Sequence, residues 1–184
     1  MRARAGQSAL LVVDMINPMD FPGADKLLRQ ALPILPALCR LKQRLKSRGV
    51  PVIYVNDNFT HWLSDFRELV AICSQPESAG AALAQALAPE HDDYLVLKPR
   101  HSGFFATPLE VLLSQLGVCH VVVTGIAGDG CVLATASDAH MRDFEVVVPS
   151  DCCASITRAR NQRALRVMRE SMRMATPIGS RVAP

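Results

Sequence analysis

The feature that most constrains this chain is the alternation of short apolar, β-branched runs with longer segments of helical periodicity. Such alternation is typical of βαβ units, in which crossover helices bury parallel strands. It predicts an α/β protein with a three-layer, doubly wound (Rossmann-like) fold and a mostly parallel sheet of about six strands in the order 3-2-1-4-5-6. The runs that predict strands are Ala9–Val13, Val52–Val55, Tyr94–Leu97, His120–Thr124 and Glu145–Val148.

The segments between these runs have apolar residues at helical spacing. Leucines between positions 28 and 45 form one stripe, and Pro33 and Pro36 predict that this helix begins near residue 33 and ends before Gly49. The tail at 175–184 is compatible with a sixth edge strand or with packing on a neighbouring subunit. Further helices are expected over 64–73, 80–86, 108–116, 130–142 and 158–173.

Length and charge narrow the classes of protein to consider. With 184 residues and 49% hydrophobic content, the chain has apolar material for one core, so we expect a single domain over residues 1–184. Its 20 basic and 17 acidic residues are scattered, which gives no support for binding nucleic acid or a membrane. The apolar run that ends at Asp14 is too short for a signal peptide or a membrane span.

The cysteines indicate a reducing compartment. Six of them lie at positions 39, 73, 119, 131, 152 and 153, without the dense spacing of secreted disulfide scaffolds. We therefore expect free thiols and a cytoplasmic protein. The cysteines and the five histidines form no CxxC, HExxH or paired zinc-ligand pattern, so no metal site and no cofactor are expected.

Ionisable residues follow several of the predicted strands. Open α/β sheets bind ligands beyond the carboxyl ends of their strands, where Asp14, Asp57, Lys98, the loop 125–131 and Asp151 fall. A carboxylate, an ammonium and a thiol that meet at one edge can adjust the proton affinity of one another. Strand-end charges also serve solubility, so this pattern alone leaves catalysis and a solvated edge equally open.

The segment 124–131 (TGIAGDGC) runs from a buried strand through a glycine-rich turn into a helix. A thiol in the first turn of a helix faces unpaired N–H groups and the positive end of the helix dipole. With the Lys98 ammonium nearby, we expect these groups to favour the thiolate of Cys131 and to be placed to stabilise an oxyanion. The alternative is that Cys131 packs as an ordinary small hydrophobe.

The same glycines are also compatible with a nucleotide-binding function. Together with Asp151, about twenty residues further on, they loosely imitate a dinucleotide-binding turn. Their order is GxxGxG rather than GxGxxG, and they follow the fourth predicted strand rather than the first. A nucleotide-binding module is therefore a weak alternative.

Three segments carry a family resemblance when they are taken together. In order and spacing they resemble the signature segments of the isochorismatase-like cysteine hydrolases, and the similarity runs from about Ser8 to Ser155. The segments are Asp14-Met15-Ile16-Asn17 with Phe21, Lys98-Pro99-Arg100-His101-Ser102 with Phe104, and Gly125-Ile126-Ala127-Gly128-Asp129-Gly130-Cys131-Val132.

The resemblance implies a catalytic triad of Asp14, Lys98 and Cys131. Asp14 would accept the thiol proton and later activate water, while Lys98 would hold the thiolate charge. The backbone amides of Ala127 and Cys131 would form the oxyanion hole, and the peptide bond between Ile126 and Ala127 would be cis. The intermediate would be a thioester.

The resemblance also implies the type of reaction and assembly. It predicts a cysteine-dependent amidohydrolase that cleaves a C–N bond of a small amide or N-carbamoyl substrate. The alternative is an isochorismatase-type vinyl ether hydrolase, but that branch of the family can dispense with the cysteine, and Cys131 is present here. A homo-oligomer is expected as well.

Asp57 marks a departure from one branch of this family. Nicotinamidases of the family carry an Asp-x-His metal site after the second strand, whereas the residue two positions after Asp57 is Phe59. This departure argues against the metal site and weakens the nicotinamidase assignment. Asp57 is expected to bridge to Lys98 or to line the pocket, or else to belong to a solvated turn.

The remaining pocket candidates are aromatic or basic. A guanidinium is suited to a substrate carboxylate, so Arg100 is a candidate for binding one, although such residues often simply face water. The aromatic candidates for the pocket wall are Phe21, Phe59, Trp62 and Phe104, and core packing is the alternative for each.

Overall fold

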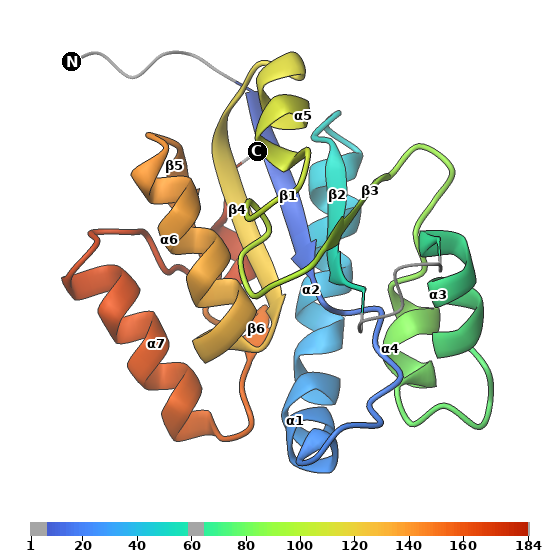
Figure 1. Cartoon of the computed structure of the whole chain (residues 1–184). Helices are drawn as coiled ribbons and strands as arrows, with labels where there is room; N and C mark the ends of the chain where they lie inside the picture. Colours follow the sequence, from blue (N-terminus) through green and yellow to red (C-terminus); the bar gives the residue numbers. More distant parts are fainter. Residues whose placement is uncertain (1–6, 59–64, 184) are drawn as a thin grey trace.

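The computed structural model describes residues 7–58 and 65–183 and is built around one parallel sheet (Figure 1). Its path of neighbouring strands is β3-β2-β1-β4-β5, and a short β6 pairs with β4. This arrangement confirms the predicted α/β class and the parallel sheet. The strands are β1 (Gln7–Val13), β2 (Val52–Asp57), β3 (Tyr94–Lys98), β4 (Val118–Ile126), β5 (Glu145–Val147) and β6 (Cys153–Ala154).

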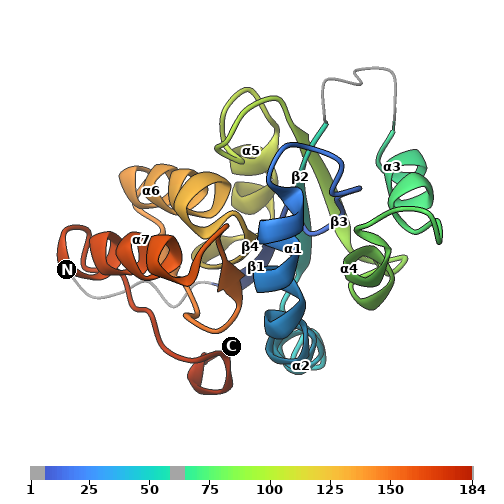
Figure 2. The same cartoon turned by 90° about the horizontal axis from the view of Figure 1, so that it is seen from below.

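Helices cover both faces of the sheet (Figures 1 and 2). Along β1, Leu10 and Val12 belong to one apolar core, whereas Leu11 and Val13 belong to the other, as the alternation of side chains along a strand requires. The first core is covered by α1 (Ala24–Ala31), α2 (Leu35–Lys46), α3 (Phe66–Cys73) and α4 (Ala81–Ala86), and the second by α5 (Leu109–Gln115), α6 (Leu133–Met141) and α7 (Arg158–Glu170).

The predicted position of the sixth strand is wrong. β6 does not extend the sheet beyond β5 but pairs with the carboxyl end of β4, at Gly125 and Ile126. Two residues are too few to show a strand period in the sequence. In the described part of the tail, the sheet contact is a single bridge from Ala175 to Val147. Arg44 of α2 then donates hydrogen bonds to carbonyl oxygens of the tail, including that of Gly179 at 2.7 Å.

The predicted start of the first long helix is also wrong. Helical structure already begins at Ala24, and a 3₁₀ turn over Leu32–Ile34 joins α1 to α2. Pro33 and Pro36 lie in the first turns of the two later segments, where a missing N–H leaves no helical hydrogen bond unmade. The prolines therefore mark the joins between helical segments rather than the beginning of the first.

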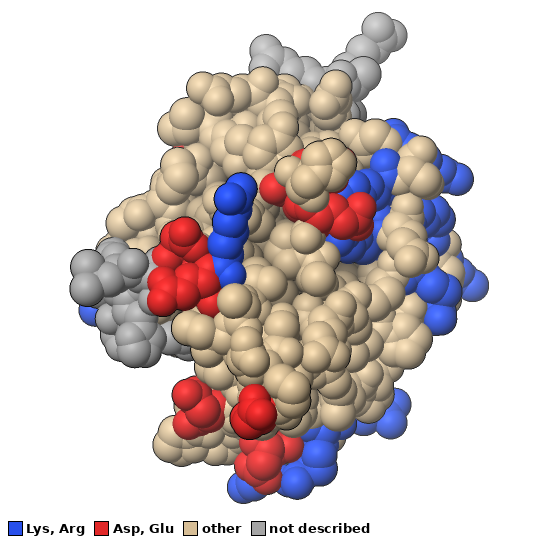
Figure 3. Space-filling model, turned by 90° about the vertical axis from the view of Figure 1, so that its right-hand side faces the viewer, with Lys and Arg blue, Asp and Glu red and all other residues tan. Residues whose placement is uncertain are grey.

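One face of the molecule has its charged residues toward the margins (Figure 3). On the face that includes α3 and α4, acidic and basic side chains surround a broad area of uncharged residues (Figure 3). Within the described ranges, no helix combines the length and the apolar character needed to cross a membrane.

Candidate active site

The order of the strands brings four of the predicted strand-end residues together, including Asp57, the last residue of β2. β1 lies between β2 and β4, and β3 lies beyond β2, so the carboxyl ends of four neighbouring strands meet at one edge. Asp14 directly follows β1, Lys98 is the last residue of β3, and Cys131 lies in the turn after β4. This edge is where the strand order reverses, which is the usual place for a ligand in an open α/β sheet.

Lys98 is the centre of this group. Its side chain is fully buried, and its Nζ lies 2.9 Å from Asp14 Oδ2, 3.4 Å from Cys131 Sγ and 3.5 Å from Asp57 Oδ2. Burial alone would lower the pKa of the ammonium, but the charges of Asp14, Cys131 and Asp57 outweigh it and raise the pKa of Lys98. The ammonium therefore stays charged between two carboxylates and a thiol.

Asp14 is held in a strained and buried position. Its φ of 52° lies in the left-handed region, which is uncommon for a residue other than glycine. Its Oδ1 accepts a hydrogen bond of 2.6 Å from the backbone N–H of Asp57, and its carboxylate also contacts the Cys131 thiol and Lys98. Burial raises the pKa of Asp14 although these partners oppose the shift. A carboxylate with a raised pKa is a stronger base toward the thiol that it contacts.

The protonation state of Cys131 differs from the expectation. Burial and the nearby Asp14 carboxylate raise the pKa of the Cys131 thiol to about 12, against the opposing charge of Lys98. The predicted thiolate is therefore wrong for the resting protein, in which the sulfur is a thiol that can donate to Asp14. Cys131 as a whole is only partly buried.

The turn that carries Cys131 is tightly built. The peptide bond between Ile126 and Ala127 is cis, and Gly125 has a φ of 112°. A Cβ on Gly125 would lie 2.1 Å from the carbonyl oxygen of Val13, so this position requires glycine. The turn continues as a single irregular helical turn over Gly128–Val132 before α6 begins.

Asn56 supports the site, a role that its position after the second predicted strand did not reveal. It is fully buried beside Asp57, where its Oδ1 accepts from Ile16 N at 3.2 Å and its Nδ2 donates to Ile16 O at 2.7 Å. This pair of bonds fixes the segment that follows Asp14. A polar residue at the end of an otherwise apolar strand was the available signal, but the sequence could not show which backbone it would contact.

The other predicted pocket residues have different surroundings. Asp57 is half-buried and forms an ion pair with Lys98, which agrees with the expected bridge between these two residues. Phe21 packs partly buried against the first core, and Arg100 is exposed. Phe104 is buried in the second core, where it packs against Phe144 and under the guanidinium of Arg142. Phe59 and Trp62 lie outside the described residues.

A metal ion at this site would need a group of donor side chains. Within residues 7–58 and 65–183, no three His, Cys, Asp or Glu side chains are grouped so that they would hold one. The two carboxylates at the site instead share the ammonium of Lys98.

Comparison with known proteins identifies the family of this chain. The model of the isochorismatase domain matches residues 8–181. The chain belongs to the isochorismatase family. Its hydrolase members include the ureidoacrylate amidohydrolase RutB of Stutzerimonas stutzeri, which is 31% identical to this chain over 179 residues, covering 79% of the chain and 69% of RutB.

Two further relatives agree with this assignment. The uncharacterized isochorismatase family protein YaaI of Bacillus subtilis is 39% identical over 160 residues, which is 87% of each chain. The crystal structure of an isochorismatase family protein from Desulfovibrio vulgaris superposes with a TM-score of 0.78 at 25% identity and covers 96% of both chains. Sequence and fold therefore agree along nearly the whole isochorismatase domain.

Proposed function

We propose that this member of the isochorismatase family is a cysteine-dependent amidohydrolase that cleaves a C–N bond of a small amide or N-carbamoyl substrate. The observation that carries the proposal is the position of the Lys98 ammonium, which lies 2.9 Å from Asp14 and 3.4 Å from the sulfur of Cys131 in a buried setting. With this geometry, Asp14 can remove the proton of the thiol during the reaction, and Lys98 can stabilise the resulting thiolate.

In the first half of the reaction, Asp14 takes the proton of the Cys131 thiol as the sulfur attacks the substrate carbonyl. The new negative charge on sulfur is formed beside Lys98, so the ion pair partly offsets the cost of charging a buried thiol. Collapse of the tetrahedral adduct breaks the C–N bond, and the proton held by Asp14 passes to the leaving amine. The product of this half is a thioester on Cys131.

In the second half, Asp14 removes a proton from water, which attacks the thioester carbonyl. The acid product leaves and the proton returns to the sulfur, so the resting thiol is restored. The backbone N–H groups of Ala127 and Cys131 are proposed to stabilise the oxyanion in both halves. The bonds from Gly130 N and Val132 N to the carbonyl oxygen of Ala127 hold the backbone of this turn in place.

The choice of an amide over a vinyl ether has two supports. Covalent acyl transfer needs a nucleophile, and the Cys131 thiol is present with a base and a cation in contact. In addition, RutB, which shares the family and 31% of aligned residues, is named as an amidohydrolase. A small-molecule substrate without a cofactor is sufficient for this chemistry.

The cysteine chemistry also supports a reducing location. All six cysteines are free thiols, including the neighbouring Cys152 and Cys153. A nucleophilic thiol is protected from oxidation where glutathione and thioredoxin keep cysteines reduced. We therefore propose that the protein works in the cytoplasm.

The proposal is tested by screening the purified protein against small amides, N-carbamoyl amino acids, ureidoacrylate and isochorismate. The expected result is release of amine or ammonia from one of the C–N compounds, with activity lost in Cys131→Ala. Cys119→Ala, at another partly buried cysteine, is the matched control and should keep full activity. Cleavage of isochorismate without cleavage of any C–N compound would reverse the assignment.

A further inference from the structure

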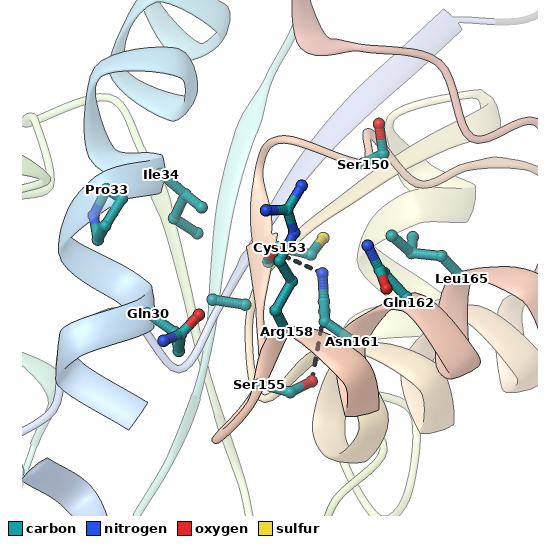
Figure 4. Close-up of a pocket in the computed structure, with 11 residues that line it drawn as sticks. Gln30, Pro33, Ile34, Ser150, Cys153, Ser155, Arg158, Asn161, Gln162 and Leu165 are labelled. Carbon is teal, nitrogen blue, oxygen red and sulfur yellow. Dashed lines mark hydrogen bonds between the residues drawn. The ribbon is translucent and has the colours of Figure 1, made fainter. Parts of the chain in front are cut away.

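A cavity of 490 Å³ lies between the segment around η1 (Leu32–Ile34) and α7. Figure 4 shows Pro33 and Ile34 on one side, Leu165 and Gln162 of α7 on the other, and Cys153 between them. Asp14, Lys98 and Cys131 do not contribute to its lining. The cavity is therefore separate from the site that holds the triad.

The charge of this cavity comes from Arg158. Among the described residues that line the cavity it alone is charged, and its side chain extends into the space between Ile34 and Gln162 (Figure 4). Its guanidinium forms no ion pair with any described residue. The nearest acidic residue in sequence, Asp151, is engaged elsewhere, because its Oδ1 accepts a hydrogen bond from the backbone N–H of Gly179.

The lining defines the class of ligand. A guanidinium binds a carboxylate through two parallel hydrogen bonds, and Gln30 and Gln162 add neutral amide donors to the lining of the cavity. A single positive charge matches one negative charge, so a monocarboxylate fits better than a phosphate dianion. The apolar side chains of Pro33, Ile34 and Leu165 suit a compact apolar body on the ligand.

Two residues of this cavity also support the turn that carries Cys131. Ser155 Oγ accepts a hydrogen bond of 3.0 Å from the backbone N–H of Asp129. Asn161 acts through Ser155: its Oδ1 accepts a hydrogen bond of 3.3 Å from Ser155 Oγ, and its Nδ2 donates to the carbonyl oxygen of Cys153 at 3.0 Å (Figure 4). A ligand that displaces Ser155, directly or through Asn161, removes the hydrogen bond that holds the backbone of Asp129, two residues before Cys131.

We propose that this cavity binds a small organic monocarboxylate and that the bound anion changes the reactivity of Cys131 through Ser155 and Asn161. Binding depends only on the cavity and Arg158. The coupling rests on the proposed function of Cys131, so the two are measured separately.

Binding is tested by isothermal titration calorimetry of the full chain with benzoate, and with benzyl alcohol as the neutral match. Benzoate should bind the wild type and Cys131→Ala equally, and at least about tenfold more weakly to Arg158→Gln. Arg163→Gln removes the same charge from an exposed position of α7 outside the cavity and should bind like the wild type. Equal binding to Arg158→Gln, or no binding to the wild type, would overturn the site.

Coupling is tested by the rate at which iodoacetamide alkylates Cys131, followed by peptide mapping. Saturating benzoate should change this rate about fivefold in the wild type and leave it unchanged in Arg158→Gln. An unchanged rate in wild-type protein that has bound benzoate would refute the coupling. If Cys131→Ala instead proved fully active on an amide, the proposed function would fail while the calorimetric result would stand.

Discussion

At the scale of single residues, the chemistry of this site depends on how one ammonium is shared. Lys98 contacts Asp14, Asp57 and Cys131, and the positions of all three after predicted strands indicated from the sequence that they would lie at one sheet edge. It gave no measure of their burial. The charge of Lys98 was therefore expected to create a thiolate, whereas burial and Asp14 raise the pKa of Cys131 to about 12.

This protonation state predicts the pH profile. The proposed mechanism needs the charged form of Asp14, whose pKa is raised above its ordinary value by burial, so kcat/KM should fall as the pH drops through that raised pKa. No basic limb from the thiol is expected below about pH 12. The measurement is kcat/KM against pH for the wild type. A profile that is flat through the acid range would show that Asp14 is not the base.

Asn56 provides a second prediction at this scale. Asn56→Asp keeps the shape of the side chain but replaces the donor that serves Ile16 O, and it buries a second carboxyl group near Asp14. The expected cost is about 2–3 kcal/mol in the free energy of unfolding, measured in urea, because a buried acceptor loses its partner. An unchanged unfolding midpoint would mean that these hydrogen bonds do not hold the segment after Asp14.

At the scale of elements, the main strands were predictable from the sequence, whereas the short strand β6 and the join between α1 and α2 were not. The apolar runs located β1 to β5 to within a few residues, because buried parallel strands are continuous and rich in β-branched residues. The pairing of β6 with Gly125 and Ile126 had no such signal. The join at Leu32–Ile34 was misplaced since proline is compatible both with the start of a helix and with a turn between two helices.

The close approach of β1 and β4 predicts a requirement for glycine at position 125. Gly125→Ala would place a Cβ 2.1 Å from Val13 O and should cost more than about 3 kcal/mol, because both the contact and the positive φ are unfavourable. Gly117→Ala is the matched control, since Gly117 has a φ of 65° and no atom within 4 Å of the added Cβ. It should cost about 1 kcal/mol. Urea unfolding of both variants measures the difference, and equal costs would contradict the packing described here.

At the scale of the whole molecule, the exposed apolar surface is relevant to the expected assembly of several copies of the chain. Large apolar side chains are exposed on the helical layer of α5 and α6, where Val111 and Met141 are 60% and 71% exposed. Such residues are common at interfaces between subunits, although they do not define one by themselves. They are consistent with the expected homo-oligomer.

This expectation is tested by light scattering coupled to size exclusion. The chain has a mass of 20.0 kDa, so the measured mass of a homo-oligomer should be at least twice that value. Val111→Lys and Met141→Lys, made singly, would show whether this surface takes part, because a buried lysine weakens an interface. A mass near 20 kDa for the wild type at micromolar concentration would show that the protein is a monomer.

The proposed function requires Cys131 to form a covalent acyl intermediate. Acid quenching of the protein during turnover of the best C–N substrate, followed by mass spectrometry of its peptides, detects such a species. The peptide with Cys131 should gain the mass of the substrate's acyl group with loss of the amine, and Cys131→Ala should gain none. Turnover by Cys131→Ala at the wild-type rate, or an acyl group on another residue, would contradict the proposed function.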